Sequence, residues 1–135
     1  MKRNTLLLIL LSLLLLALVA CGGNGATENG ADIEIDAETG LPLNPVDTRS
    51  GPFVVEGTLS SLNTTPQNAP EFVVRAPSGQ TYRIRSQPLS ETFFSDGEPV
   101  TPSTIRQGMT VRATAEFDPN IQIFTSEDLV FIREE

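Results

Sequence analysis

Hydrophobic and polar positions alternate with a period of two along four stretches of the chain. The longest is residues 109–117, where Met, Val, Ala, Ala and Phe alternate with Thr, Arg, Thr and Glu. Residues 53–60, 71–76 and 81–85 alternate over shorter spans. A period of two places successive side chains on opposite faces of a strand. The pattern predicts four β-strands, each with one buried face, and residues 121–132 predict one or two more.

The connection between the second and third stretches is Pro77-Ser78-Gly79. This sequence predicts a three-residue hairpin loop, a type I turn followed by Gly79 in the left-handed conformation. Such a loop fixes the strand register, and in that register apolar residues face apolar residues and opposite charges meet. The predicted pairs are Phe72 with Ile84, Val74 with Tyr82, and Glu71 with Arg85.

Residues 86–108 form a long polar connection with one hydrophobic pair, Phe93-Phe94. Its last part predicts one helical turn, with Ser103 as N-cap and Gly108 at the C′ position. Three strands, a long connection with a helical turn and two further strands is the order of an OB-type barrel. Residues 51–135 are therefore expected to fold as an all-β, small five- to six-stranded OB-like barrel.

The same region resembles small OB-like domains of unknown function found in bacterial lipoproteins. The resemblance lies in a first strand with Val-Glu-Gly-Thr-Leu at residues 55–59, in the turn glycine Gly79, and in Ile-Arg-Gln-Gly-Met-Thr-Val at residues 105–111. These motifs mark strand starts and a tight turn. The resemblance implies an OB-like barrel and brings no active-site residues with it.

The N-terminus carries a different pattern. Residues 1–4, Met-Lys-Arg-Asn, are positively charged, and residues 6–19 are apolar except for Ser12. A membrane-spanning helix needs about 20 apolar residues, whereas this run covers about 21 Å at the rise of an α-helix. The pattern predicts a cleaved signal peptide over residues 1–20.

The apolar run ends in Leu18-Val19-Ala20-Cys21, which resembles the lipobox of bacterial lipoproteins, and Cys21 is the only cysteine in the chain. The resemblance implies cleavage before Cys21, a diacylglyceryl group on its thiol, and acylation of the new α-amine with a chain such as palmitate. Two or three acyl chains on one residue anchor a protein durably. We expect an extracytoplasmic protein held by this lipid at the cell membrane or the outer membrane. The alternative is an ordinary secretory signal cut after Ala20.

Residues 21–50 are rich in Gly, Asn, Pro and acidic residues, which predicts a lipid-anchored flexible acidic linker. Within it, four acidic residues from Asp32 to Glu38 alternate with Ile33, Ile35 and Ala37. A calcium loop of the EF-hand type would need Gly at position 6 and Glu at position 12, and this segment has Ala and Leu there. The remaining interpretations are a solvated linker and a short edge strand that docks its two isoleucines.

Composition restricts the chemistry. The chain has no histidine, and its one lysine, Lys2, lies in the predicted signal peptide. Without residues 1–20, seven arginines stand against 17 acidic residues, a net charge of −10. The lack of histidine removes the usual general base and zinc ligand, and an acidic chain repels phosphate backbones. We expect no enzymatic activity, no cofactor, no metal and no nucleic-acid partner.

Two functional hypotheses follow. On the predicted register, Arg75, Arg83 and Arg85 lie with Val73 on the outward face of the second and third strands. OB barrels bind oligomeric ligands across this face, so the first hypothesis is a binding module for an acidic glycan, a peptide or a protein. The competing interpretation is a solvated face balanced by Glu71 and neighbouring acidic residues.

The second hypothesis is a structural or accessory subunit that docks on another envelope protein. Val54 and the Phe93-Phe94 pair would then be exposed anchors, and a surface apolar patch around them would favour docking. The competing interpretation is that Phe93 or Phe94 caps the end of the barrel.

Overall fold

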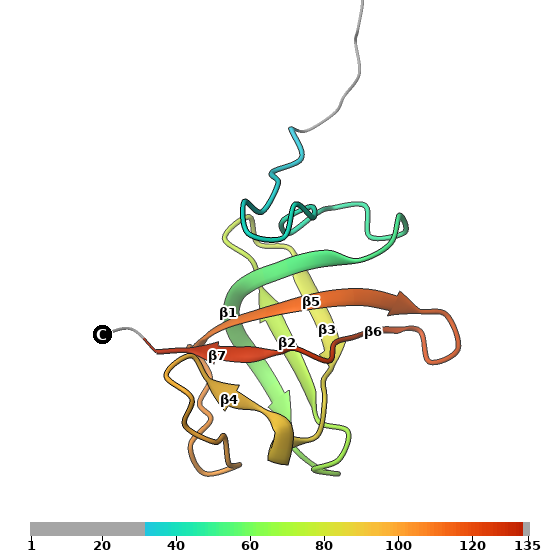
Figure 1. Cartoon of the computed structure of the whole chain (residues 1–135). Helices are drawn as coiled ribbons and strands as arrows, with labels where there is room; N and C mark the ends of the chain where they lie inside the picture. The colour runs from blue at the N-terminus through green and yellow to red at the C-terminus, as the bar shows by residue number, and fades with distance from the viewer. Residues whose placement is uncertain (1–31, 134–135) are drawn as a thin grey trace, which may run out of the picture. The chain divides into compact units, whose positions relative to one another are not determined.

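A computed structural model describes residues 32–133 of the chain (Figure 1). These residues form seven β-strands, one short 3-10 helix and no α-helix. The elements are β1 (Phe53–Asn63), β2 (Glu71–Arg75), β3 (Thr81–Arg85), η1 (Leu89–Glu91), β4 (Phe93–Phe94), β5 (Thr110–Asp118), β6 (Ile123–Thr125) and β7 (Val130–Ile132). Within this described part, no helix has the length and apolar character needed to cross a membrane. The expected all-β class is confirmed. The predicted signal peptide and Cys21 lie outside the described residues.

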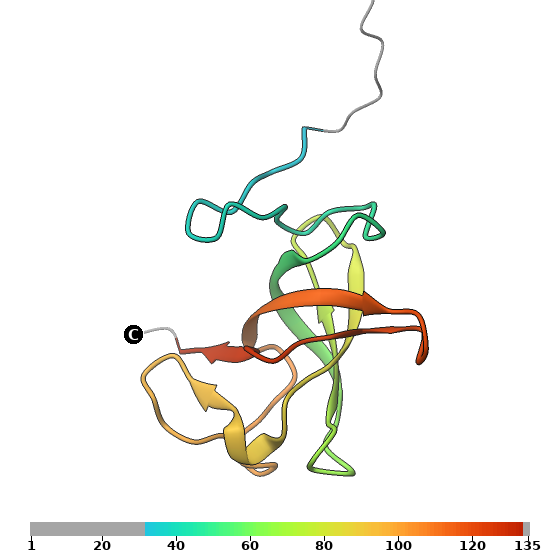
Figure 2. The same cartoon turned by 45° about the vertical axis from the view of Figure 1, so that its right-hand side comes forward.

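Five strands close into a barrel in the order β1-β2-β3-β6-β5, and β5 pairs back onto β1. The β3–β6 pair is parallel, and the other four pairs of the barrel are antiparallel. The short strands β7 and β4 extend from β5 beyond the barrel (Figures 1 and 2). This closed five-stranded mixed barrel confirms the OB-like order expected from the sequence.

β1 is long enough to pair with two neighbouring strands, β5 and β2. Its first half, Phe53–Thr58, pairs with β5, and its second half pairs with β2 from Thr58 onward, with a bulge between Leu59 and Ser61. The strand bends at Gly57, where an added Cβ would collide with the carbonyl oxygen of Arg75. The absence of a side chain therefore lets β2 approach β1 at the corner of the barrel.

The β2–β3 hairpin has the predicted register. Phe72 faces Ile84, Val74 faces Tyr82, and Glu71 faces Arg85. Gly79 has a φ of 91°, which confirms the left-handed conformation expected at the end of the loop. The four apolar members of these pairs are fully buried, so the prediction of which face of the hairpin points inward is correct.

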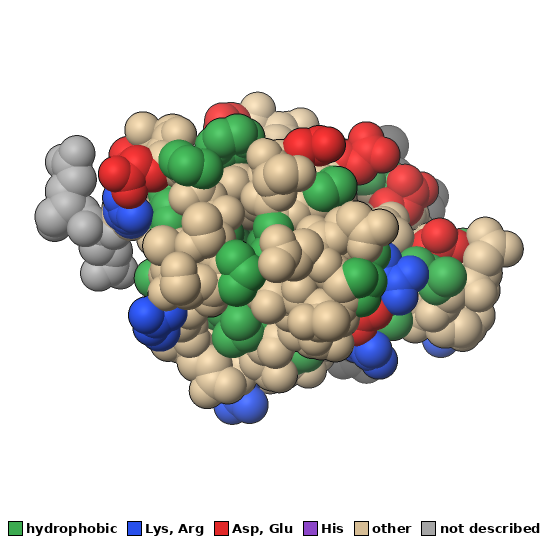
Figure 3. Space-filling view, turned by 90° about the horizontal axis from the view of Figure 1, so that it is seen from below, with side chains coloured by type: hydrophobic (Ala, Val, Ile, Leu, Met, Phe, Trp, Pro, Cys, Tyr) green, Lys and Arg blue, Asp and Glu red, His purple; other side chains and the backbone are tan. Residues whose placement is uncertain are grey.

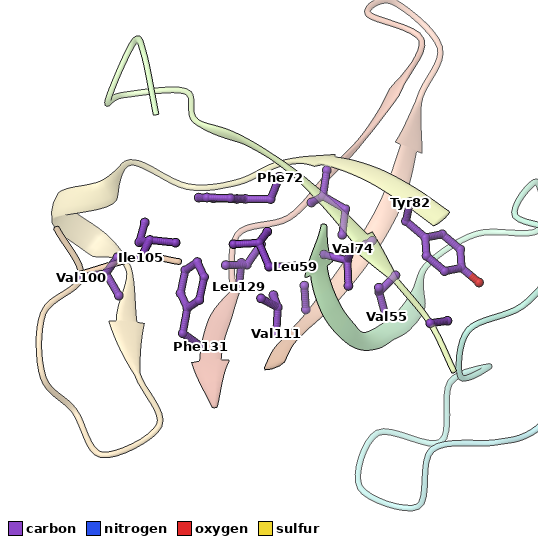
Figure 4. Close-up of a cluster of buried hydrophobic side chains, with 14 of the residues drawn as sticks. Val55, Leu59, Phe72, Val74, Tyr82, Val100, Ile105, Val111, Leu129 and Phe131 are labelled. Atoms are coloured by element: carbon purple, nitrogen blue, oxygen red, sulfur yellow. The ribbon is translucent and has the colours of Figure 1, made fainter. Parts of the chain in front are cut away.

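The core fills the barrel and continues past one end of it. Val55, Val74 and Tyr82 lie toward one end of the cluster, and Phe72, Leu129 and Phe131 toward the other (Figure 4). The rings of Phe72 and Phe131 meet edge to face at 5.5 Å between centroids. Further core residues come from the connection between β4 and β5 and pack beside Phe131. They are Val100 and Ile105.

The predicted helical turn from Ser103 to Gly108 is wrong. The segment forms separate turns, in which the Thr104 amide donates to the Thr101 carbonyl at 3.0 Å and the Thr101 amide donates to Thr104 Oγ1 at 2.9 Å. A helix has a costly nucleus, so a few residues form one only with strong support. Here the threonine hydroxyl supports a single turn instead. Gly108 keeps the positive φ, 92°, that its position predicted.

Residues 34–45, which we call the strap, precede β1 and fold into a small hairpin. Ile35 bridges Pro42, and the Gly40 amide donates to the Asp36 carbonyl at 2.8 Å. The strap lies beside the start of β1, where Leu43 forms a parallel bridge with Val54 (Figures 1 and 2). The flexible linker expected over residues 21–50 thus contains a segment folded against the barrel.

The strap docks through its polar groups. Ile33 and Ile35 remain 64% and 54% exposed, so the interpretation in which the isoleucines dock is wrong. Asp36 is instead 7% exposed and pairs with Arg112 on β5. Its partner lies 76 residues away in the chain, which explains why the local sequence pattern of the strap does not predict the contact.

Candidate functional site: the outer face of β2 and β3

The three candidate arginines lie together on the outside of the β2–β3 hairpin. Strand alternation places them there because Phe72, Val74, Tyr82 and Ile84 fill the inward positions. Across the hairpin, Arg83 faces Val73. Arg75 sits at the loop end of the same face and Arg85 at its other end. The structure therefore brings together the residues that the sequence selected.

Glu71 binds two of the three arginines. Its carboxylate accepts hydrogen bonds from Arg83 Nε at 2.9 Å and from Arg85 Nη2 at 2.7 Å. The hydrogen bond from Arg85, followed by that from Arg83, lowers the pKa of Glu71 below its ordinary value. The predicted balance by Glu71 is thus real and leaves two positive charges on the face. An exposed pair of this kind contributes about 1 kcal/mol or less, so Glu71 positions the arginines more than it stabilises the fold.

Several donors of the face point away from Glu71. Within residues 32–133, Arg75 is exposed and forms no ion pair. Arg85 Nε also has no hydrogen-bond partner, but this atom is buried and does not face a ligand in solvent. Arg83 keeps 62% of its side chain exposed. A guanidinium offers five N–H donors in a planar fork that matches a carboxylate. The face can therefore accept a further carboxylate beside Glu71.

Hydroxyl groups surround the arginines. Thr58 of β1 and Thr81 of β3 flank Arg75 on the two sides of β2. Thr125 of β6 pairs with Arg85 across the parallel strand contact, and Ser61 pairs with Val73. Hydroxyls both donate and accept hydrogen bonds, so the face combines carboxylate donors with groups suited to sugar hydroxyls. The position of Thr81 opposite Arg75 follows from the predicted hairpin register. The position of Thr58 depends on the β1–β2 pairing, that of Ser61 on the bulge in β1, and that of Thr125 on the β3–β6 pairing, and the sequence pattern predicted none of these.

Charge is distributed unevenly over the rest of the surface. Seen from below, acidic side chains gather along one edge, and basic side chains lie separately around the rest of the rim (Figure 3). Arg112 and Arg133 are each held by carboxylates, Arg112 by three and Arg133 by two. The β2–β3 face differs from these sites, since there the arginines outnumber the carboxylate.

A concave site lies elsewhere, between the turn of the strap and the outer face of β5. It is a shallow hollow of about 200 Å³, lined by Glu38, Thr39, Arg112, Ala113, Thr114, Asp128 and Val130. The guanidinium in it already binds Asp36, Glu38 and Glu56. Asp128 accepts the Thr114 amide at 2.7 Å. The polar groups of this hollow satisfy one another, which makes it the weaker candidate.

The proposed docking anchors are mostly buried. Val54 is 1% exposed beside the strap, so its prediction as an exposed anchor is wrong. Phe94 is 3% exposed, packs 6.0 Å from Phe131 between ring centroids, and lies under the Arg133 guanidinium. Phe93 alone of the three is exposed, at 45%. The interpretation in which Phe94 caps the core is confirmed.

In the part of the chain that the structure describes, no three His, Cys, Asp or Glu side chains group so as to hold a metal ion. The sequence matches no family model and no curated protein. The candidate function therefore rests on the geometry and chemistry of the outer face of β2 and β3.

Proposed function

We propose that the chain is an envelope-anchored lipoprotein whose barrel is a binding module for a carboxylate-bearing ligand, an acidic glycan or an acidic peptide. One observation carries the ligand class: the outer face of β2 and β3 holds three arginines, and its one carboxylate, Glu71, binds only Arg83 and Arg85. OB barrels use the corresponding face for oligomeric ligands. The surrounding hydroxyls favour a uronate-containing glycan over a peptide.

The anchor part of the proposal depends on the sequence. Cys21 follows a short apolar run in a lipobox-like context. Lipid on this residue would fix the barrel to one membrane surface without a transmembrane helix. A binding module in that position would hold an envelope polymer close to the membrane.

Titration calorimetry with oligogalacturonate and with an oligoglutamate peptide tests the ligand class. Arg75→Ala and Arg83→Ala should each weaken binding about tenfold, since one charge-assisted contact is worth about 1.5–3 kcal/mol. Arg49→Ala is the matched control, because Arg49 is also exposed and lies before β1. Equal affinities for the wild-type protein and the Arg75 and Arg83 variants would refute the site.

The second candidate is an accessory subunit that docks on another envelope protein. The observation in its favour is the β5–β6 hairpin, where Phe117 and Ile121 are each 38% exposed. Phe117 packs against Phe124 at 5.6 Å between ring centroids, so an apolar strip continues from the core to the surface. Co-purification from native membranes that is lost in Phe117→Ser, while oligogalacturonate binding is absent, would favour this function.

A further inference from the structure

The strap is hydrogen-bonded to β1 like an added strand. The Val54 amide donates to the Pro42 carbonyl at 2.8 Å, and the Asn44 amide donates to the Val54 carbonyl at 2.8 Å. The side chain of Asn44 continues the pattern: its Nδ2 donates to the Glu56 carbonyl and its Oδ1 accepts the Glu56 amide, both at 2.9 Å. The strap thus satisfies four backbone groups of β1.

These backbone groups belong to an edge that the barrel leaves open. From Phe53 to Thr58, β1 pairs with β5 on one side, whereas β2 pairs with β1 only from Thr58 onward. Within residues 32–133, the strap is the segment that covers the other side. An open edge beside an apolar residue, here Val54, is a template for an added strand.

An ion pair fixes the strap in its register. Asp36 accepts from Arg112 Nη2 at 2.6 and 2.7 Å, and the same turn is closed by the Thr39 amide, which donates to Asp36 Oδ2. Arg112 also holds Glu56 of β1 at 2.8 Å. The docking site is therefore the β1 edge from Val54 to Glu56 together with Arg112, and its complement is Asp36 with residues 42–44.

The connection from the strap to β1 makes few contacts of its own. After Pro45, whose carbonyl accepts the Tyr82 hydroxyl at 2.8 Å, residues 46–52 are mostly exposed. Their one hydrogen bond to a side chain is local, from the Arg49 amide to Asp47. Seven residues span up to about 23 Å when extended. If the strap of one copy docked on the barrel of a second copy, this connection would join the two barrels. The docked strap would then form the same contacts with β1 and Arg112 of the second copy.

We propose that this docking site is exchangeable and that its second occupant is the strap of another copy of the chain, which gives a strap-exchanged dimer. The strap already carries the complement of the site, so exchange between copies costs little contact energy. Two chains of net charge −8 repel each other across ordinary surfaces. The exchanged pairing of Asp36 with Arg112 replaces the same pairing within each copy, so this contact neither favours nor opposes the dimer. Exchange is therefore governed by the protein concentration and by the length of the connection.

A synthetic peptide of residues 32–46 tests whether the site accepts a strap from outside. The receptor is the full-length protein with Asp36→Asn and Asn44→Ala, which weakens its own strap and leaves the β1 edge and Arg112 intact. Fluorescence polarisation should show binding at least tenfold tighter than to the wild-type protein. A peptide carrying the same two substitutions is the control and should not bind. A variant that keeps the wild-type circular dichroism yet fails to bind the peptide overturns the proposal.

Shortening the connection tests the dimer itself. Deletion of residues 46–51 from the full-length protein leaves one residue between Pro45 and Phe53, which is too short for a strap that runs parallel to β1 to return to the start of the same strand. Light scattering in detergent should then give twice the wild-type protein mass, and adding Asn44→Ala should return the monomer mass. A shortened protein that stays folded and monomeric overturns the exchange, even where the peptide binds. If the shortened protein does not fold, two wild-type samples with different affinity tags are unfolded and refolded together at high concentration, where exchange between copies is favoured. A failure of the two tags to co-purify after this treatment overturns the proposal.

Discussion

At the scale of single residues, two side-chain amides form the pair of hydrogen bonds that a backbone amide and carbonyl of a neighbouring strand would form. Asn44 pairs with both backbone groups of Glu56, and Gln87 pairs in the same way with Leu129, at 2.8 and 3.2 Å. Glu56 lies on a stretch of β1 that β2 does not pair with, and Leu129 lies directly before β7. A buried amide or carbonyl without a partner costs about 1–3 kcal/mol, so these two side chains complete the hydrogen bonding of irregular segments.

Glycine 79 allows a direct test of the hairpin turn. Its φ of 91° is strained for any residue with a Cβ, although nothing in space blocks one. Gly79→Val should lower the free energy of unfolding by about 1–2 kcal/mol, the scale of forcing an L-residue into the left-handed region. Urea denaturation measures the effect, and Ser78→Val in the same loop is the control. Equal midpoints for the two variants would contradict the turn assignment.

At the scale of elements, the β2–β3 hairpin was predictable and the strap was not. In the hairpin, the turn residues and the alternation of Phe72, Val74, Tyr82 and Ile84 point to one register, which the structure has. The strap depends on a contact between Asp36 and Arg112 across 76 residues and on a positive φ of 48° at Asn44. No short-range pattern encodes either feature. The candidate arginines were found because alternation assigns faces, whereas their partners on neighbouring strands needed the barrel.

The two faces of β3 should differ in their sensitivity to mutation. Ile84 is fully buried, so Ile84→Ala should cost about 2–5 kcal/mol of unfolding free energy. Arg83 is largely exposed, and Arg83→Ala should change stability by about 0.5 kcal/mol or less. Urea melts of both variants give the comparison. If the arginine variant were as destabilised as the isoleucine variant, Arg83 would not be an outward residue available to a ligand.

Acid should release the strap. The hydrogen bond from Arg112 holds the pKa of Asp36 below its ordinary value of 3.8. A carboxyl with a lowered folded-state pKa stabilises the fold above its unfolded-state pKa, and this contribution is lost as the pH falls below about 3.8. The NMR shift of the Val54 amide should follow this transition. Glu38→Gln is the control and should retain it, because Glu38 is 82% exposed; Asp36→Asn should show a released strap at every pH.

At the scale of the whole molecule, strap and barrel form one unit within residues 32–133. Limited proteolysis of the full-length protein should therefore give a protected fragment that begins before Asp36 rather than near Gly51. Asn44→Ala should shift the cut into residues 46–52, where most side chains are exposed. Mass spectrometry identifies the fragment ends. Cleavage of the wild-type protein at residues 46–52 ahead of all other sites would show that the strap is not held.

The proposed attachment of the molecule to a membrane depends on Cys21. The intact mass of protein extracted from membranes should lack residues 1–20 and should carry added acyl mass on Cys21. Cys21→Ser should move the protein from the detergent phase to the aqueous phase, because removal of two or three acyl chains removes the anchor. A serine variant that partitions like the wild-type protein would disprove lipidation.

The strap also has a mechanical consequence. Any pull on the chain from its N-terminal side enters the described structure at residue 32 and meets the strap before β1. The contacts of Asp36 with Arg112 and of Asn44 with Glu56 carry the load first. When they break, the 12 residues of the strap lengthen the chain by up to about 40 Å, while the β1–β5 ladder stays unloaded. Under tension, the strap should therefore detach before any strand of the barrel separates. The barrel and its arginine face would then stay folded.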